Sequence, residues 1–163
     1  MNQHGGISKS MAKKSSSSSS HLLLDTHILL WLASGDERLS QSSINTIEKA
    51  AQRRELRLSV ITLWEIGYLI KKGRVNLSSD IKTYWEQTLE RLFAQDLAIN
   101  ADDIVQYHKL PENFHGDPGD RFLVSQAITR GMRLMTADSK IIPFADQLAP
   151  ARILAANASQ ESD

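Results

Sequence analysis

Short apolar runs alternate along this chain with longer segments whose apolar residues recur every three or four positions. The first run is LLL at residues 22–24, and THILLWLA at residues 26–33 follows it after a single aspartate. An apolar run without polar interruption is typical of a strand buried on both faces, and the wider spacing is typical of a helix. The pair therefore predicts a buried strand that passes directly into a helix.

The same pairing continues to the end of the chain. It predicts further strands at residues 56–60, 97–99, 133–138 (with a closing turn) and 151–156, and further helices at residues 40–54, 62–72, 79–95, 100–109 and 120–130. Thr62, with Glu65 three positions later, fits a capping box at the start of one helix. Residues 110–119 contain two prolines and two glycines and predict a loop. Because strands and helices alternate, the pattern predicts an α/β sandwich with a mainly parallel sheet.

The composition is that of one globular domain with polar ends. The chain has 163 residues, of which 41% are hydrophobic, enough to bury a substantial single core. Residues 1–20 include six consecutive serines and are predicted to be a disordered tail, residues 21–155 the folded domain, and residues 156–163 a flexible C-terminal tail. No apolar run is long enough to span a membrane and no secretory signal is visible, so we expect a cytoplasmic protein.

The absence of cysteine narrows the possible chemistry. It excludes disulfides, thiolate zinc sites, iron–sulfur clusters and cysteine nucleophiles, so any metal must be bound by oxygen or imidazole. Basic and acidic residues both number 19, and this zero net charge does not indicate a polyanionic partner as a strongly basic domain would.

Four acidic residues are candidates for a functional site. Asp25 and Asp138 follow predicted strands, and Asp120 opens a helix that crosses back over the sheet, so all three are expected at the edge where the strands end. Glu65 lies on a partly apolar stripe of its helix, where a carboxylate is costly without a cation or hydrogen-bond donors. Each acid also fits a simple cap of a helix or strand. Carboxylates gathered together repel one another, however, and a divalent cation relieves that repulsion.

Three segments resemble a known family: LLLDTHILLWLASGDERLS, SVITLWEIGYLIKKGRVNL and DPGDRFLVSQAITRGMRLMTAD. They combine D-T-H after a strand, W-E-I on a helix, D-P-x-D-R before a helix and T-A-D after a strand. In this combination the chain is similar to the PIN domain, specifically to the VapC-like toxin nucleases of bacterial toxin–antitoxin pairs. The resemblance extends from Leu22 to about Leu154.

This resemblance implies a metal-dependent endoribonuclease on a three-layer α/β/α sandwich with a mainly parallel central sheet. Such proteins are usually homodimers inhibited by a cognate antitoxin protein, and they use water to hydrolyse RNA, which leaves 5′-phosphate and 3′-hydroxyl ends. The catalytic residues implied by motif, which would also bind Mg²⁺ or Mn²⁺, are Asp25, Glu65, Asp120 and Asp138. The implied supporting residues are Thr136, which would orient a carboxylate or water, and Asp117, which would bond to the loop or to Arg121.

One position departs from the family pattern. Gly119 stands between the proline and the second aspartate, where relatives commonly carry a bulky apolar residue, often Phe. We expect the acid to stay in place and the loop to lose a packing anchor.

Two other function classes fit part of the pattern. A metal-dependent phosphatase or phospho-acceptor domain also places an aspartate after its first strand, but the phosphatase form needs a second aspartate at the position of His27. A catalytically inactive PIN-fold interaction protein would bind only its antitoxin, and the four retained acids speak against it. His27 and His115 are rival catalytic groups for a metal-free ribonuclease. Trp64 and Trp85 are expected to pack in the core rather than to stack on bases.

Overall fold

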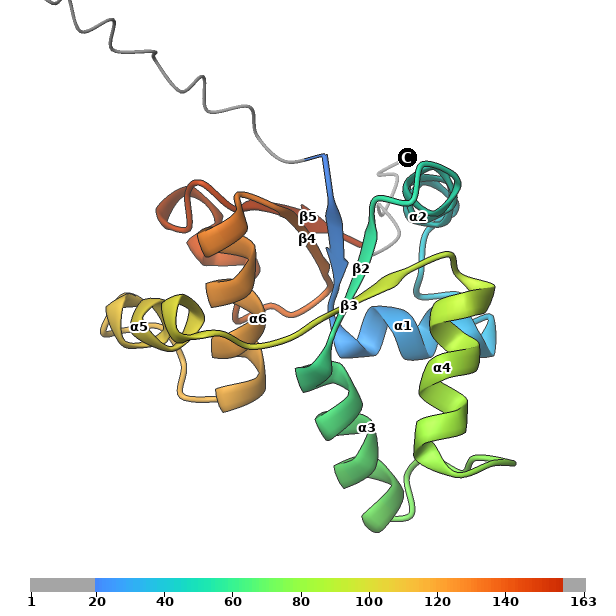
Figure 1. Cartoon of the computed structure of the whole chain (residues 1–163). Helices are drawn as coiled ribbons and strands as arrows, with labels where there is room; N and C mark the ends of the chain where they lie inside the picture. Colours follow the sequence, from blue (N-terminus) through green and yellow to red (C-terminus); the bar gives the residue numbers. More distant parts are fainter. Residues whose placement is uncertain (1–19, 157–163) are drawn as a thin grey trace, which may run out of the picture.

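The central layer is a parallel sheet whose middle strand is the LLL run. The computed structural model describes residues 20–156, and its strands are β1 (Leu22–Leu24), β2 (Leu56–Ser59), β3 (Gln95–Leu97), β4 (Arg133–Thr136) and β5 (Arg152–Ala155) (Figure 1). The strand order is β3-β2-β1-β4-β5, and every neighbouring pair is parallel. All three leucines of β1 are fully buried, as expected for a strand that is covered on both faces.

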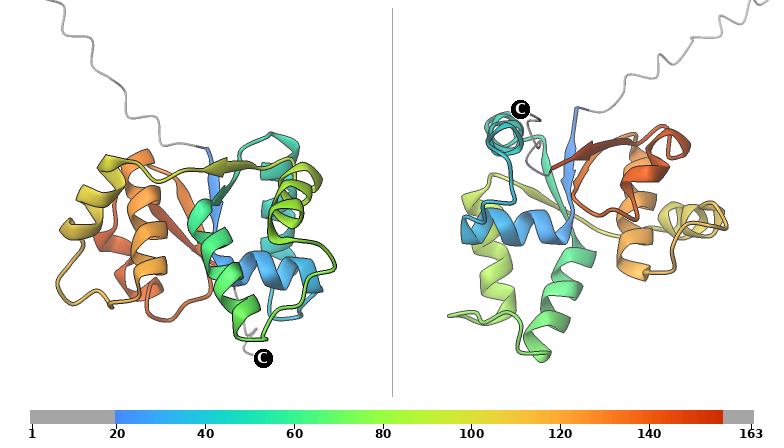
Figure 2. Two further views of the ribbon diagram at one scale, coloured as in Figure 1. Left: turned by 60° about the horizontal axis from the view of Figure 1, so that its bottom comes forward. Right: turned by 180° about the vertical axis from the view of Figure 1, so that it is seen from behind.

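Helices cover both faces of this sheet. They are α1 (Thr26–Ser34), α2 (Gln41–Gln52), α3 (Val60–Lys71), α4 (Ile81–Arg91), α5 (Ala101–Lys109), α6 (Pro118–Arg130) and the 3₁₀ helix η1 (Ile142–Gln147). Both views of Figure 2 show α1, α2 and α4 on one side and α5 and α6 on the other. Leu22 and Leu24 join one core cluster and Leu23 the other, because successive strand residues point to opposite faces. The predicted three-layer α/β/α sandwich is confirmed.

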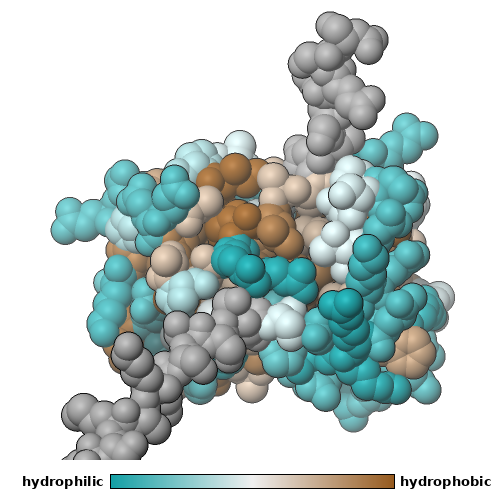
Figure 3. Space-filling model, turned by 90° about the horizontal axis from the view of Figure 1, so that it is seen from above, coloured by the Kyte–Doolittle hydropathy of each residue, from teal (hydrophilic) through white to brown (hydrophobic). Residues whose placement is uncertain are grey.

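Helix α3 lies below the sheet, at the edge where the strands end (Figure 1). It joins the two layers, since its Ile61 packs in the core cluster on the α6 side and its Ile66 packs in the cluster around α1. Glu65 is thereby placed at the junction of the two layers. Figure 3 shows the opposite end of the molecule, where β1 begins, and there hydrophobic side chains lie among hydrophilic ones.

Helix α3 begins two residues earlier than predicted. The Ser59 hydroxyl at the end of β2 accepts a hydrogen bond from the Ile61 N–H at 3.0 Å and caps the helix, so Val60 is its first residue. Thr62 is fully buried inside the helix. The predicted capping box of Thr62 and Glu65 is therefore wrong, and Glu65 is free of that role.

Helix α6 also begins earlier than predicted. Its N-cap is Asp117, whose carboxylate accepts a hydrogen bond from the Asp120 N–H at 3.2 Å, and Pro118 fills the first helical position. Asp120 consequently lies within the first turn and is not a cap, so its side chain is available for other contacts.

Two boundaries near β3 were predicted wrongly. The helix expected to reach residue 95 ends at Arg91, because the backbone turns at Phe93, whose φ of 49° is incompatible with a right-handed helix. The strand expected at residues 97–99 lies at Gln95–Leu97, where Gln95 pairs with Arg57 of β2. β3 is an edge strand with two exposed residues, so backbone pairing rather than an apolar run defines it.

The ends of the described chain are tied to the sheet. Ala156 is fully buried, its N–H donates to the Thr136 carbonyl at 2.9 Å, and its carbonyl accepts from the Ser43 hydroxyl at 3.2 Å. The folded domain thus extends one residue beyond the predicted boundary at 155. Apart from Ser20 and Ala156, the predicted tails lie outside the described residues. Between residues 20 and 156 no helix is long and apolar enough to cross a membrane.

Candidate metal centre

Asp25 is held at the end of the central strand by a threonine from the neighbouring strand. The Thr136 hydroxyl donates to Asp25 Oδ2 at 2.6 Å, and Thr136 Oγ1 accepts a hydrogen bond from the Asp138 N–H at 3.0 Å. Asp25 is 2% exposed and makes no capping bond to α1. Burial raises the pKa of Asp25, and the hydrogen bond from Thr136 offsets part of that rise. Thr136 therefore fixes the positions of two of the predicted acids at once.

Glu65 approaches this pair from below, on α3. Its carboxylate is hydrogen-bonded to Thr26, whose hydroxyl oxygen is also paired with that of Thr62 at 3.1 Å. Burial raises the pKa of Glu65 to about 7, and the charges of Asp25 and Asp117 add to the rise. A carboxyl group with this pKa has too few favourable partners to carry its charge without cost.

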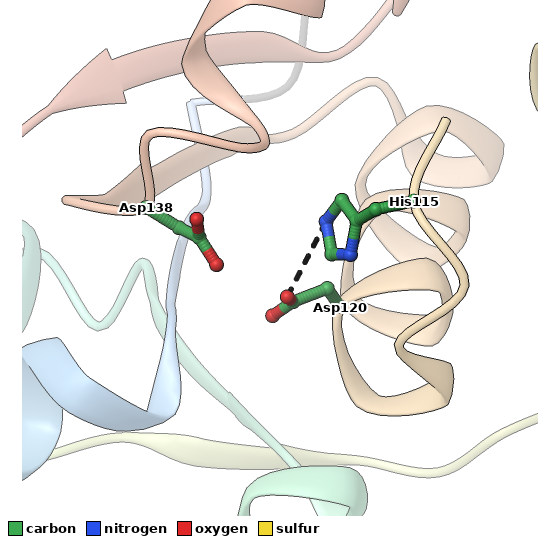
Figure 4. Close-up of side chains that lie close together, drawn as sticks. All are labelled: His115, Asp120 and Asp138. Atoms are coloured by element: carbon green, nitrogen blue, oxygen red, sulfur yellow. Dashed lines mark ion pairs between the residues drawn. The ribbon is translucent and has the colours of Figure 1, made fainter. Parts of the chain in front are cut away.

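Asp120 and Asp138 face each other across the same edge. Figure 4 shows Asp120 at the start of α6 and Asp138 after β4, with His115 beside them. Burial raises the pKa of Asp120 to about 8, and the charges of Asp25 and Asp138 contribute. His115 Nε2 lies 3.4 Å from Asp120 Oδ2. One ligand atom from each of His115, Asp120 and Asp138 lies within 4.8 Å of the other two.

The structure thus brings all four predicted acids to one end of the sheet. Three of them, Asp25, Glu65 and Asp120, have raised pKa values, with burial as the main cause and neighbouring carboxylates as a further one. Among residues 20–156, no lysine or arginine forms an ion pair with these four acids, and the basic side chains beside them are His115 and His27. Oxygen donors that repel one another in this way fit a hard divalent cation.

Of the predicted supporting residues, Thr136 orients the acids, whereas Arg121 and Asp117 organise the loop and the start of α6. Arg121 Nη1 donates to the carbonyls of Phe114 and His115 at 3.1 and 3.2 Å, and Nη2 donates to the carbonyl of Tyr107 at 3.1 Å. Asp117 caps α6, because its carboxylate accepts a hydrogen bond from the Asp120 N–H in the first turn of that helix. The D-P-x-D-R motif therefore fixes the turn between the loop and α6, and this turn places Asp120 beside the other acids.

Gly119 makes room for Glu65. A Cβ atom at this position would lie 1.9 Å from Glu65 Oε1, 2.9 Å from Glu65 Cδ and 3.2 Å from Asp117 Oδ1. The Glu65 carboxylate thus occupies the space that the first carbon of a larger side chain would take. In this chain the lack of a side chain at Gly119 allows the Glu65 carboxylate to take its observed position.

Of the two tryptophans predicted to pack in the core, only one does so, and of the two candidate histidines, only one lies at the acids. Trp85 is 5% exposed and packs in the core as predicted, whereas Trp64 is 59% exposed, so the core position predicted for it is wrong. Trp64 lies on the outer face of α3, which has more apolar residues than the core covers. His27 is exposed at the start of α1, and His115 lies at the acids. The H-x-D-P-x-D-R spacing was the signal that places His115 there.

Two hollows flank the acids. One, of about 330 Å³, lies between α3 and the start of α6 and is lined by His27, Trp64, Glu65, Tyr68, Leu69, Asp117 and Pro118. The other, of about 240 Å³, is lined by Asp25, His27, Trp31, Ala137, Asp138 and Ser139. Glu65 therefore lines one hollow, and Asp25 and Asp138 line the other.

Comparison with known proteins agrees with this geometry. The family model of the PIN domain matches residues 22–146. The chain is 30% identical over 120 residues to Ribonuclease VapC22 of Mycobacterium tuberculosis (strain ATCC 25618 / H37Rv), a match that covers 74% of this chain and 88% of that protein.

Solved structures share the fold. VapBC2 from Rickettsia felis, bound to a DNA fragment from their promoter, has a TM-score of 0.62 at 19% identity, covering 82% of this chain and 97% of that chain. VapBC-5 from Mycobacterium tuberculosis, a member of the VapBC family of toxin–antitoxin systems, has a TM-score of 0.53 at 17% identity, covering 84% and 98%. From the family match, the identity to VapC22 and the shared parallel-sheet sandwich, we conclude that the chain belongs to the PIN domain family.

Proposed function

We propose that the protein is a metal-dependent endoribonuclease that hydrolyses RNA phosphodiester bonds, and that it is the toxin of a toxin–antitoxin pair. The observation that carries the proposal is the meeting of four acids, three with raised pKa values, at the carboxyl edge of a PIN-domain sheet. The relative named as a ribonuclease supports RNA as the substrate.

The residues that would hold Mg²⁺ or Mn²⁺ are Asp25, Glu65, Asp120 and Asp138. When bound, such an ion lowers the pKa of a water molecule and neutralises charge that develops on the phosphate. The protein contributes a fixed arrangement of ligands: Thr136 orients Asp25, and Arg121 anchors the loop beside Asp120. Water as the nucleophile leaves 5′-phosphate and 3′-hydroxyl ends.

The proposed partners are an RNA substrate, a cognate antitoxin protein and a second copy of the chain. Similarity to VapBC complexes supports the antitoxin. We propose that the protein acts in the cytoplasm, where RNA and antitoxin are both present.

The two alternative functions account for less of the structure. In the phosphatase reading, position 27 should supply a second acid toward the site, but His27 is an exposed residue of α1. An inactive interaction protein has no use for Thr136 bonded to one acid carboxylate and to the backbone of another. A nuclease uses both hydrogen bonds of Thr136, because they fix two of the acids that would bind the metal.

The test is cleavage of a labelled RNA by purified protein with Mg²⁺ or Mn²⁺, and again with EDTA. Asp25→Asn, Glu65→Gln and Asp120→Asn should each abolish most cleavage, whereas Glu48→Gln, an exposed position on α2, should retain it. Unchanged cleavage in EDTA, or by Asp120→Asn, contradicts the proposal.

A further inference from the structure

We propose that His115 is a nitrogen ligand of this metal centre, and that the centre therefore prefers Mn²⁺ to Mg²⁺. The inference deepens the proposed function and rests on it. It adds an imidazole to the four acids that the PIN-domain resemblance implies.

The first support is the position of the imidazole. Two ligands bound about 2.1 Å from one cation at roughly a right angle are about 3 Å apart. His115 Nε2 and Asp120 Oδ2, at 3.4 Å, are close to that separation. The three side chains of His115, Asp120 and Asp138 point toward one another from two loops and a helix (Figure 4), with their ligand atoms within 4.8 Å.

The second support is the state of Nε2. This nitrogen is buried and has no hydrogen-bond partner among the described residues, since its contact with Asp120 lacks hydrogen-bond geometry. A buried polar atom without a partner is costly, and such atoms in native proteins usually have an explanation. Coordination of a cation by the nitrogen lone pair removes this cost.

The third support is the rigidity of the residue that carries the ring. The Arg121 guanidinium holds the carbonyl of His115 at 3.2 Å and that of Phe114 at 3.1 Å. The imidazole stacks on Phe114, itself 3% exposed, with ring centroids 4.7 Å apart. Because Arg121 follows Asp120 directly, one turn of α6 fixes both the acid and the loop that carries the imidazole. Preorganisation of this kind is what a metal ligand needs.

The expected metal preference follows from ligand chemistry. Mg²⁺ strongly favours oxygen ligands and retained water. Divalent ions of the first transition series accept nitrogen ligands more readily than Mg²⁺ does, and Mn²⁺, the first ion of that series, also suits carboxylates. A site with four carboxylates and one imidazole therefore binds Mn²⁺ more tightly than an all-carboxylate site, with little gain for Mg²⁺.

The test is calorimetric titration of the purified full chain with MnCl₂ and with MgCl₂. His115→Ala should weaken Mn²⁺ binding by about tenfold or more and weaken Mg²⁺ binding by less, so the ratio of the two affinities falls. His115→Gln retains a polar side chain without the nitrogen lone pair and should behave in the same way. His108→Ala, an exposed histidine of α5, is the matched control and should change neither affinity.

A spectroscopic measurement tests for the bound nitrogen without relying on affinities. Electron spin echo modulation of the Mn²⁺-loaded wild-type protein should show a directly bound nitrogen, which disappears in His115→Ala. Absence of that signal from the wild type, or an equal loss of affinity for both ions, overturns the inference and leaves His115 as a neighbour of Asp120 only. If the wild type binds neither ion, the proposed function itself fails.

Discussion

Replacement of Gly119 by alanine tests whether this glycine sets the position of Glu65. An alanine Cβ would lie 1.9 Å from Glu65 Oε1 and 2.9 Å from Glu65 Cδ, whereas real Cβ contacts essentially never fall below 3.0 Å. The nearest atoms belong to the end of a flexible side chain, so the carboxylate rotates away while the backbone of α6 stays. We therefore expect a local change at the acids and a normal fold.

The magnitude follows from the distance. To restore a separation of 3.0 Å, Oε1 must move by more than about 1 Å, and functional groups must be held within about 0.5 Å of their working geometry. The movement also breaks the hydrogen bond between Glu65 and Thr26. Disturbing one ligand in this way costs about 10–100-fold in metal affinity. Alanine is the better helix former by up to about 1 kcal/mol, so the metal-free protein should unfold at nearly the same temperature as wild type.

The assay is Mn²⁺ titration of wild type and Gly119→Ala, each with and without Glu65→Ala. If the effect acts through Glu65, Gly119→Ala costs affinity in the wild-type background and almost nothing in the Glu65→Ala background. Gly116→Ala is the matched control in the same loop, because no atom lies within 4 Å of a Cβ there. Wild-type affinity in Gly119→Ala, or an equal loss in both backgrounds, would refute the reasoning.

Four further predictions address the acids, one buried ion pair and the N-terminal segment. Without metal, the raised pKa values of Glu65 and Asp120, about 7 and 8, stabilise the folded state most at acidic pH, and this stability is lost as pH rises through these values. Tm in EDTA should therefore fall between pH 5 and 8, and millimolar Mn²⁺ should remove this dependence of Tm on pH. Asp120→Asn should raise Tm in EDTA by a few degrees and abolish the further rise that Mn²⁺ gives wild type, whereas Asp146→Asn, exposed on η1, should do neither. Arg130→Met leaves the fully buried Asp103 without its ion pair and should destabilise the protein by about 3 kcal/mol in urea unfolding; an unchanged midpoint would contradict this. A chain that starts at residue 21 should retain the RNA cut sites and metal dependence of the full chain, and a loss of either would give the first twenty residues a function.

Patterns governed by burial could be predicted from the sequence. The LLL run predicted a strand that is covered on both faces, and Asp25, which follows it, was expected at the edge of the sheet where the strands end. Helix boundaries that depend on single hydrogen bonds were harder to predict. Ser59 and Asp117 cap α3 and α6, but serine and aspartate are common, and Thr62 and Asp120 fitted the same role equally well by pattern.

The edge shared by the acids could be predicted, but the contacts between particular side chains of distant segments could not. The fit of Gly119 against Glu65 joins positions 54 residues apart, and its meaning depends on a space that only the folded chain defines. β3 was predicted two residues too late, because an edge strand with exposed residues carries little apolar signal to set its bounds. The exposure of Trp64 was missed for the opposite reason, since an apolar stripe can be wider than the surface that buries it.

The most direct test of the central claim, that these acids hydrolyse RNA through a bound cation, is end-mapped sequencing of cellular RNA after brief induction of the protein. Wild type should produce new cut sites whose downstream fragments carry 5′-phosphate, and Asp25→Ala, produced at the same level, should produce none. The same cut sites in Asp25→Ala, or fragments that carry 5′-hydroxyl and 2′,3′-cyclic phosphate ends, would contradict the account.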